Sequence, residues 1–193
     1  NFKNIKPKIV SDQRIIFTSI SRIIPYKGHI ILIRIFDVLC KKNDNIHLQI
    51  IGDTLPQYQE YLDKLKWEVK KRNLGNKIKF LAFRKDVKSI LENSSFFIHT
   101  PKSADPLPTV IFEAIESKTP VITNNLGGAF EILNNGKNGL MIKNDLINES
   151  AEKILKYIEN HELQTENVER AYDYVCKNFS VENFEKQITQ IIE

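Results

Sequence analysis

Thr109 and Glu113 place a hydroxyl and a carboxylate one helical turn apart, beside backbone groups able to bind an anion. They lie in a segment with helical periodicity that starts around Pro106–Pro108, and proline fits a first helical turn because its missing N–H would have no partner there. Residues four apart on a helix are separated by about 5–6 Å. The free N–H groups of Thr109 and Val110, with the helix dipole, suit a phosphate, and the carboxylate suits a pair of sugar hydroxyls. This stretch indicates a nucleotide site.

Two cations, Arg22 and Lys27, occupy the loop after the first predicted strand. Ligands of open parallel sheets bind outside the carboxyl ends of the strands. The loops expected to meet there are residues 21–28, 52–55, 82–86, 100–107 and 124–128. Two fixed cations in a partly dry cleft stabilise the negative charge that builds on a departing nucleoside diphosphate. We therefore expect Arg22 and Lys27 to face the same edge as Thr109.

Three other residues are expected at this edge of the sheet, and each has a possible role in the site. Gly52 opens the loop after the second predicted strand, and Arg84 lies in the loop after the third. Arg84 could stack on or bond a nucleotide base, and an exposed loop arginine without a ligand is an equal alternative. His99 ends the fourth strand beside the acidic loop. We interpret His99 as a structural residue and not as a catalytic base.

Strand and helix alternate along most of the chain. Short apolar runs predict buried strands at residues 14–20, 46–51, 77–81, 95–99, 120–123 and 139–142. Helices are predicted at residues 29–42, 57–72, 87–93, from 106–108 to about 118, 148–160, 165–177 and 181–192, the last with Ser180 as N-cap. Helical crossovers of this length favour a parallel sheet covered on both faces. We predict an α/β fold, a Rossmann-like parallel β-sheet flanked by helices, with a helical C-terminal extension.

The helix predicted to start around residues 106–108 has one apolar face. Its apolar stripe comprises Leu107, Val110, Ile111, Ala114 and Ile115. Such a stripe faces the sheet in an α/β fold. Thr109, Glu113 and Glu116 lie on another face of this helix.

The length, composition, net charge and cysteine count of the chain limit the class of protein. A chain of 193 residues with 41% hydrophobic and 27% charged residues predicts a single globular domain over residues 1–193. The net charge of +4 does not by itself argue for nucleic acid, and we predict no nucleic-acid partner. Two unpatterned cysteines, Cys40 and Cys176, favour reduced thiols and a cytoplasmic protein. No apolar run approaches the roughly 20 residues that span a membrane.

The order of motifs around the acidic loop resembles a known family. Asp105 and Glu113 match the Glu/Asp-x7-Glu motif of retaining GT-B glycosyltransferases, most closely family 4. The family's usual sequel is a Pro-Val strand and then Gly-Gly-x-x-Glu, and it is present as Pro120-Val121, Gly127-Gly128 and Glu131. Taken singly, Asp105 reads as a helix N-cap and Glu113 as an exposed helix residue. The flanking pattern favours the motif.

The resemblance implies a role for each candidate residue. Asp105 would contact the donor sugar, while Arg22 and Lys27 would stabilise the departing diphosphate; these three form the predicted catalytic set. The predicted nucleotide-binding set is Gly52, Arg84, Leu107, Pro108, Thr109, Val110 and Glu113. Glu113 would hold the ribose hydroxyls, and Thr109 and Val110 the diphosphate. The chain contains no Asp-x-Asp, so we predict no metal site and no cofactor.

By this resemblance the chain is the C-terminal, donor-binding domain of a glycosyltransferase, one half of a GT-B fold. The reaction would be retaining, metal-independent transfer of a hexosyl group from a nucleotide-diphosphate sugar to a polysaccharide, lipid-linked or other glycan acceptor. A UDP-sugar is the first candidate donor, with GDP- and ADP-sugars as alternatives. The acceptor would bind an N-terminal domain that is absent from this chain, so we expect the isolated domain to be inactive.

Two other functions share this architecture. One is a non-catalytic nucleotide-sugar-binding subunit that needs a partner chain, and the other is a GT-B-like sugar-nucleotide epimerase. A charge cluster at residues 64–72 is most simply a solvated helix face. Its alternative is a contact with anionic lipid, which would place the protein at the inner face of the membrane.

Overall fold

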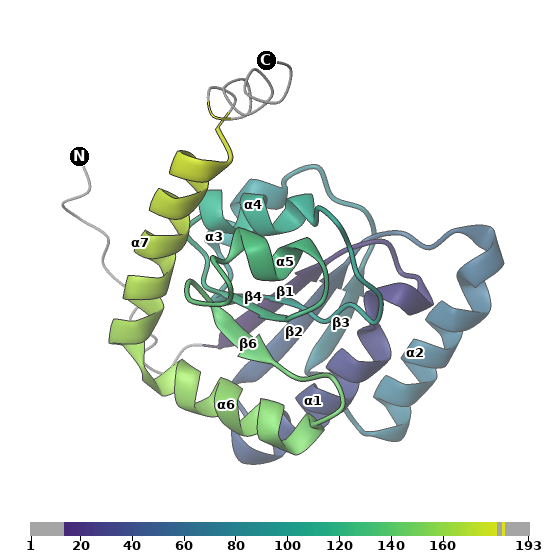
Figure 1. Ribbon diagram of the computed structural model, residues 1–193. Helices are drawn as coiled ribbons and strands as arrows, with labels where there is room; N and C mark the ends of the chain where they lie inside the picture. Colours follow the sequence, from purple (N-terminus) through teal and green to yellow (C-terminus); the bar gives the residue numbers. More distant parts are fainter. Residues whose placement is uncertain (1–13, 181–182, 184–193) are drawn as a thin grey trace.

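The computed structural model describes residues 14–180 and 183, and its centre is a six-stranded parallel sheet (Figure 1). The strands are β1 (Ile15–Ile20), β2 (Ile46–Ile51), β3 (Ile78–Leu81), β4 (Phe96–His99), β5 (Val121–Asn124) and β6 (Leu140–Ile142). Their order across the sheet is β3-β2-β1-β4-β5-β6, and each neighbouring pair is parallel. This confirms the predicted α/β fold and all six predicted strands.

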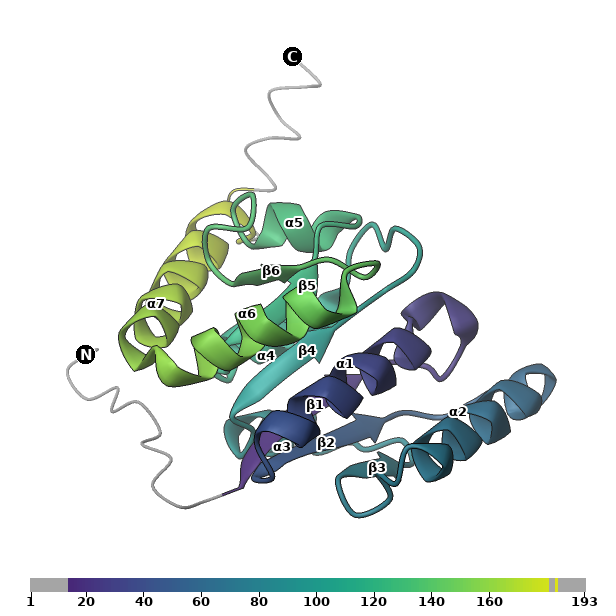
Figure 2. The same ribbon diagram turned by 90° about the horizontal axis from the view of Figure 1, so that it is seen from below.

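Helices cover both faces of the sheet, as Figures 1 and 2 show. One face carries α1 (His29–Lys42), α2 (Gln59–Lys71) and α6 (Ile147–Glu159), and the other carries α3 (Val87–Glu92), α4 (Thr109–Glu116), α5 (Gly128–Ile132) and α7 (His161–Asn178). Two short 3₁₀ turns, η1 (Pro25–Lys27) and η2 (Pro56–Tyr58), precede α1 and α2. None of the helices in the described part of the chain is long and apolar enough to cross a membrane.

The core consists of two apolar clusters separated by the sheet. Under α1, α2 and α6, Phe17 packs edge-on against Phe36, with ring centroids 5.1 Å apart, and stacks on Phe96. On the other face, Phe97 packs with apolar residues of α3, α4 and α5. Because both faces are buried, the strands are near-continuous apolar runs rather than alternating ones. That is why they could be recognised in the sequence.

The strand order creates a switch point between β1 and β4. The chain moves outward from β1 through β2 to β3, then returns to pair β4 with the free edge of β1. The connections after β1 and β4 therefore diverge to opposite sides of the sheet. In doubly wound folds the ligand crevice lies at this point, outside the carboxyl ends of the strands.

The helix after the acidic loop starts later than predicted. Pro108 is its N-cap, with a φ of −73° and a ψ of 85°, and Thr109 is its first residue. Leu107 therefore lies before the helix with its side chain 56% exposed, so its predicted place in the buried apolar stripe was wrong. Ile111, Ala114 and Ile115 are buried as expected.

Other differences concern the helices of the second half. The five-residue α5 was not predicted, because it begins at Gly128 and is too short to show a helical period. The last described helix starts at His161, four residues before the predicted start. The side chain of Asn160 caps it by accepting a hydrogen bond from Leu163 N. The helix predicted at 181–192 lies outside the described residues except for residue 183.

Candidate functional site

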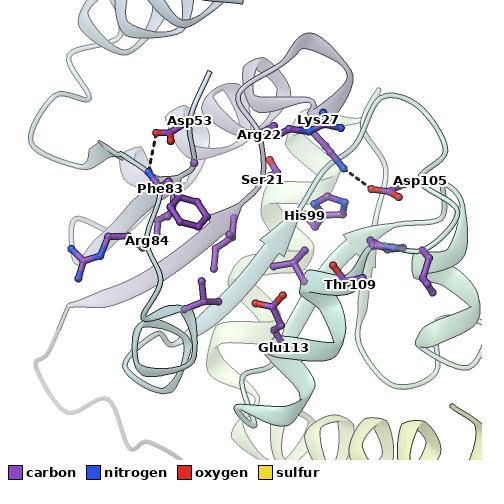
Figure 3. A pocket seen from close by; sticks show the side chains of 17 residues that line it. Ser21, Arg22, Lys27, Asp53, Phe83, Arg84, His99, Asp105, Thr109 and Glu113 are labelled. Carbon is purple, nitrogen blue, oxygen red and sulfur yellow. Dashed lines mark hydrogen bonds and ion pairs between the residues drawn. The ribbon is translucent and has the colours of Figure 1, made fainter. Parts of the chain in front are cut away.

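A cavity of about 380 Å³ lies at the switch point, outside the ends of β1, β2 and β4 (Figure 3). A volume of this size is in the range of small-molecule sites. All ten residues predicted for the catalytic and nucleotide-binding sets line it: Arg22, Lys27, Gly52, Arg84, Asp105, Leu107, Pro108, Thr109, Val110 and Glu113. These residues come from four separate loops and one helix, so the fold brings together positions up to 91 residues apart.

The start of α4 is open toward this cavity. Pro108 has no side chain able to cap the helix, and no side-chain cap bond is formed. The first N–H groups of a helix have no intrahelical partner. Thr109 and Val110, both lining the cavity, therefore present uncommitted donors at the positive end of the helix dipole. This arrangement favours an anionic group such as a phosphate.

Lys27 and Asp105 form an ion pair across the cavity, with 2.5 Å between Nζ and Oδ2 (Figure 3). Burial alone would raise the pKa of Asp105, but the hydrogen bond and charge of Lys27 outweigh it and lower that pKa. Asp105 is therefore a carboxylate at neutral pH. The prediction placed these two residues in one site, but it did not foresee that they bond each other.

Two glycines hold the acidic loop in place by allowing a close backbone approach. A Cβ on Gly127, whose φ is +70°, would lie 2.4 Å from the carbonyl oxygen of Asp105. The N–H of Gly128 donates to that same oxygen at 2.8 Å. The Gly-Gly sequence therefore has a physical reason at this position. A larger residue at Gly127 would push the Asp105 backbone away, and a Cβ on Gly128 would lie 2.0 Å from the carbonyl oxygen of Pro106.

Glu113 lies one turn into α4, on the side that faces the cavity (Figure 3). Its pKa is raised, chiefly because partial burial disfavours the charge and further because Glu116 is close. Among the described residues Glu113 has no ion-pair partner, whereas Glu116 pairs with Lys88 at 3.1 Å. The Glu113 carboxylate is available to a ligand with hydroxyl groups.

The other end of the cavity lies beyond β2 and β3. Gly52, with a φ of +146°, passes so close to Ser21 that a Cβ would lie 2.0 Å from its carbonyl oxygen. Phe83 is 63% exposed, and its N–H donates to Asp53 Oδ1. Sequence reasoning assigned no role to Phe83 or Asp53, although a phenylalanine in an expected edge loop was a usable signal. Arg84 pairs with Asp86, and its guanidinium points away from Lys27 in Figure 3.

His99 lies on the floor of the cavity and is only 1% exposed. Its pKa is lowered to about 4, first by burial and then by the charge of Lys27. The imidazole is therefore neutral at physiological pH. Among the described residues its Nε2 has no hydrogen-bond partner. Also within this part of the chain, no three His, Cys, Asp or Glu side chains gather in a way that could hold a metal ion.

This fold and cavity define the class: a Rossmann-like α/β domain of the kind that forms half of a GT-B glycosyltransferase. The structure superposes on that of Anabaena Alr3699/HepE, crystallised in complex with UDP, with a TM-score of 0.83, 28% identity, and coverage of 93% of this chain and 49% of the other. The family model described as Glycosyl transferases group 1 matches residues 1–174. The chain therefore belongs to this family, and the resemblance seen in its motifs is confirmed.

Relatives of known sequence agree with this assignment. The poly(ribitol-phosphate) alpha-N-acetylglucosaminyltransferase of Staphylococcus aureus (strain COL) is 26% identical over 178 residues, which are 92% of this chain and 35% of that protein. A crystal structure of the C-terminal domain of a group 1 glycosyltransferase from Francisella tularensis shares the fold, with a TM-score of 0.74, 23% identity, and coverage of 88% of both chains. The chain spans 35%, 43% and 47% of the length of three curated relatives that it matches.

Proposed function

We propose that this chain is the donor-binding half of a retaining, metal-independent glycosyltransferase that uses a nucleotide-diphosphate sugar. One observation carries the proposal. A single cavity at the switch point combines the open N-terminus of α4, two cations and a carboxylate that has no ion-pair partner among the described residues. Those groups match, in order, a phosphate, a diphosphate that gains charge as it leaves, and a ribose with two hydroxyls.

We infer one orientation of the donor along the cavity. Its diphosphate lies against the N–H groups of Thr109 and Val110 and near Arg22 and Lys27. Its ribose hydroxyls donate to Glu113, and its base lies toward the loop after β3, next to Gly52 and Arg84. Leu107 and Pro108 form the wall between phosphate and sugar. The sugar reaches Asp105, where the bond between its anomeric carbon and the diphosphate oxygen breaks and a bond to the acceptor hydroxyl oxygen forms with retention of configuration. The nucleoside diphosphate leaves with the hydroxyl proton.

We infer a UDP-sugar as donor and a glycan as acceptor. Support comes from Alr3699/HepE, which is described in complex with UDP-glucose, and from the UDP-Gal:alpha-D-GlcNAc-diphosphoundecaprenol alpha-1,3-galactosyltransferase of Escherichia coli, a 27% identical relative. The acceptors named for the relatives are a poly(ribitol-phosphate) and a lipid-linked saccharide. An acceptor of this kind would bind a second, N-terminal domain that closes over the cavity.

The proposed need for a second domain has a consequence for catalysis by this chain alone. Holding donor and acceptor together can lower a barrier by roughly 7–11 kcal/mol, and this chain supplies only the donor side. We therefore infer that the chain alone binds the donor without transferring its sugar. Addition of the N-terminal half would restore transfer.

The proposal is tested by calorimetric titration of UDP, GDP and ADP into the chain and into two variants of α4. Glu113→Gln removes the ribose acceptor, and Glu116→Gln makes the same change three residues away, outside the cavity. Loss of a charged hydrogen bond costs about 1.5–3 kcal/mol, so Glu113→Gln should weaken binding of the preferred nucleotide about 10- to 100-fold. Glu116→Gln should match the parent. Absence of saturable binding by the parent would refute the donor site.

We further infer that the protein works at the inner face of a membrane and touches it through α2. This helix exposes Trp67, at 54%, among the lysines Lys64, Lys66, Lys70 and Lys71. The ammonium group of Lys71 lies 4.7 Å from the Trp67 ring centroid. Lysines near an anionic bilayer contribute about 1 kcal/mol each, and tryptophan favours the interface. The four exposed lysines of α2 outnumber its two exposed acidic residues, Glu60 and Asp63, which favours anionic lipid as the partner.

Trp67 is the sole tryptophan of the chain, so its fluorescence reports directly on this contact. Vesicles containing phosphatidylglycerol should shift its emission to the blue, whereas pure phosphatidylcholine vesicles should not. Replacing both Lys70 and Lys71 with alanine should weaken binding about tenfold or more, and Lys153→Ala on α6 should have no such effect. Unchanged emission with phosphatidylglycerol would rule out the contact.

A further inference from the structure

We propose that Asp105 competes with the donor diphosphate for Lys27, so that the site discriminates against the nucleoside diphosphate left after transfer and favours the intact sugar nucleotide. The inference rests on the proposed function and concerns the selectivity of the same cavity. Its basis is the 2.5 Å ion pair between Lys27 Nζ and Asp105 Oδ2. The two side chains are only 19% and 24% exposed, so this contact is not an ordinary surface pair.

The two partners differ in how firmly the fold holds them. The backbone of Asp105 bridges to Gly127 and accepts the N–H of Gly128, and both glycines leave no space for movement toward them. Lys27 reaches the pair on a four-carbon side chain from the end of η1. A ligand that needs the lysine therefore moves Lys27, while Asp105 stays where it is.

A nucleoside diphosphate and a sugar nucleotide leave Asp105 in different states. When UDP takes Lys27 for its phosphates, Asp105 loses its cation in a partly buried position and has no ligand group to replace it. A buried charge without a partner is costly. A sugar nucleotide takes Lys27 in the same way but brings sugar hydroxyls, which donate to the Asp105 carboxylate. Only UDP bears the full cost of breaking the pair.

Arg22 differs from Lys27 in its ion pairing. It lines the same cavity and is exposed, and among the described residues no carboxylate pairs with it. It can therefore bind the diphosphate of either ligand without giving up a partner. The competition proposed here belongs to the lysine alone.

The test compares the dissociation constants of UDP and UDP-glucose for the parent chain, Asp105→Asn, Lys27→Ala and the double variant. Asp105→Asn should bind UDP about three- to tenfold more tightly than the parent, since Lys27 is released. It should bind UDP-glucose no more tightly than the parent, so the ratio of the two constants moves toward UDP. In the Lys27→Ala background, Asp105→Asn should no longer tighten UDP binding, because nothing remains to be released.

Asp145→Asn provides the charge control, because it makes the same change in net charge outside the donor cavity. It should leave both constants within twofold of the parent. Equal tightening of UDP by Asp145→Asn, or unchanged or weaker UDP binding by folded Asp105→Asn, would overturn the competition. Tightening that persists in the Lys27→Ala background would overturn it too. If the parent binds no UDP at all, the proposed function itself fails, so the two failures are distinct.

Discussion

Two cavities adjoin the segment between β4 and α4, and they differ in what their polar groups are doing. The donor cavity lies at β1 and β4, and a second one, of about 540 Å³, lies beyond the ends of β5 and β6. The second cavity also carries two lysines, Lys102 and Lys143, together with several asparagines. By volume and charge alone, the second cavity would be judged a better anion site than the donor cavity.

The amide NH₂ groups of two asparagines in the second cavity are committed to the fold, although the buried Oδ1 of Asn144 has no hydrogen-bond partner among the described residues. The amides of Asn124 and Asn144 both donate to the carbonyl oxygen of Pro101, each at 2.7 Å. Asn124 also accepts the N–H of Leu126. In the donor cavity, by contrast, no side chain among the described residues caps the first N–H groups of α4 or pairs with the Glu113 carboxylate. A binding site is marked by preorganised groups with unused hydrogen-bonding capacity, and volume does not reveal this property.

The largest expected effect comes from removing the two cations of the donor cavity, Arg22 and Lys27. Two charged hydrogen bonds at about 1.5–3 kcal/mol each imply that Arg22→Ala with Lys27→Ala weakens UDP binding at least about 100-fold. The matched pair Lys102→Ala with Lys143→Ala should leave the UDP dissociation constant within twofold. Calorimetric titration measures both. An equal loss in the second pair would erase the distinction between the cavities.

The free energy of unfolding should depend on the polar groups of the second cavity, in contrast to UDP binding. Asn124→Ala removes the hydrogen bonds to Pro101 and Leu126 at a buried position, so the free energy of unfolding should fall by about 1–3 kcal/mol. Urea titration followed by circular dichroism gives this value directly. Its exposed neighbour supplies the control, since Asn125→Ala in the same cavity should unfold like the parent. A lower UDP affinity with unchanged stability in Asn124→Ala would assign ligand binding to the second cavity.

The smallest effect concerns pH and Glu113. Because its pKa is raised above 4.5, the protonated form is stabilised in the free protein, and ribose binding requires the carboxylate. UDP affinity should therefore fall as the pH drops toward and through that raised pKa. Glu113→Gln should remove this part of the pH dependence, while Glu116→Gln should retain it. Calorimetry between pH 7.5 and about 5 follows the difference, and identical pH profiles in parent and Glu113→Gln would exclude the carboxylate.

The same pKa shift affects stability with the opposite sign. A carboxyl group whose pKa is higher in the folded than in the unfolded chain favours folding when protonated and opposes it when ionised. At neutral pH Glu113 therefore destabilises the free protein slightly. Glu113→Gln should melt no lower than the parent, which keeps its binding defect separate from any folding defect.

Much of the fold could be predicted because its signals are local. Six buried strands appear as apolar runs, and their alternation with helices defines a parallel sheet. Since carboxyl ends of parallel strands share one edge, residues such as Arg22 and Glu113 could be placed together from the sequence alone. The same reasoning could not locate α5, whose five residues start at Gly128 and carry no readable period.

What could not be predicted depends on geometry between distant segments. The pair Lys27–Asp105 joins side chains 78 positions apart, and neither residue type signals the other. Leu107 was wrongly included in the apolar stripe of α4, because the backbone of Pro108 postpones the start of that helix. The structural use of Asn124 was also hidden, since a hydrogen bond to Pro101 follows from the path of a loop and not from a motif.

The pairing of β1 with β4 also affects the order in which the segments of the protein can fold. The bond from Ile16 N to Ser95 Oγ spans 79 positions, whereas Gln49 and Thr18, on β2 and β1, are 31 apart. Closing a longer loop costs more chain entropy, and contacts distant in sequence slow folding. The β1–β2–β3 unit can assemble from nearer segments, but the crevice has no floor until β4 docks. We therefore expect the binding surface to form late in folding, after the β1–β2–β3 unit.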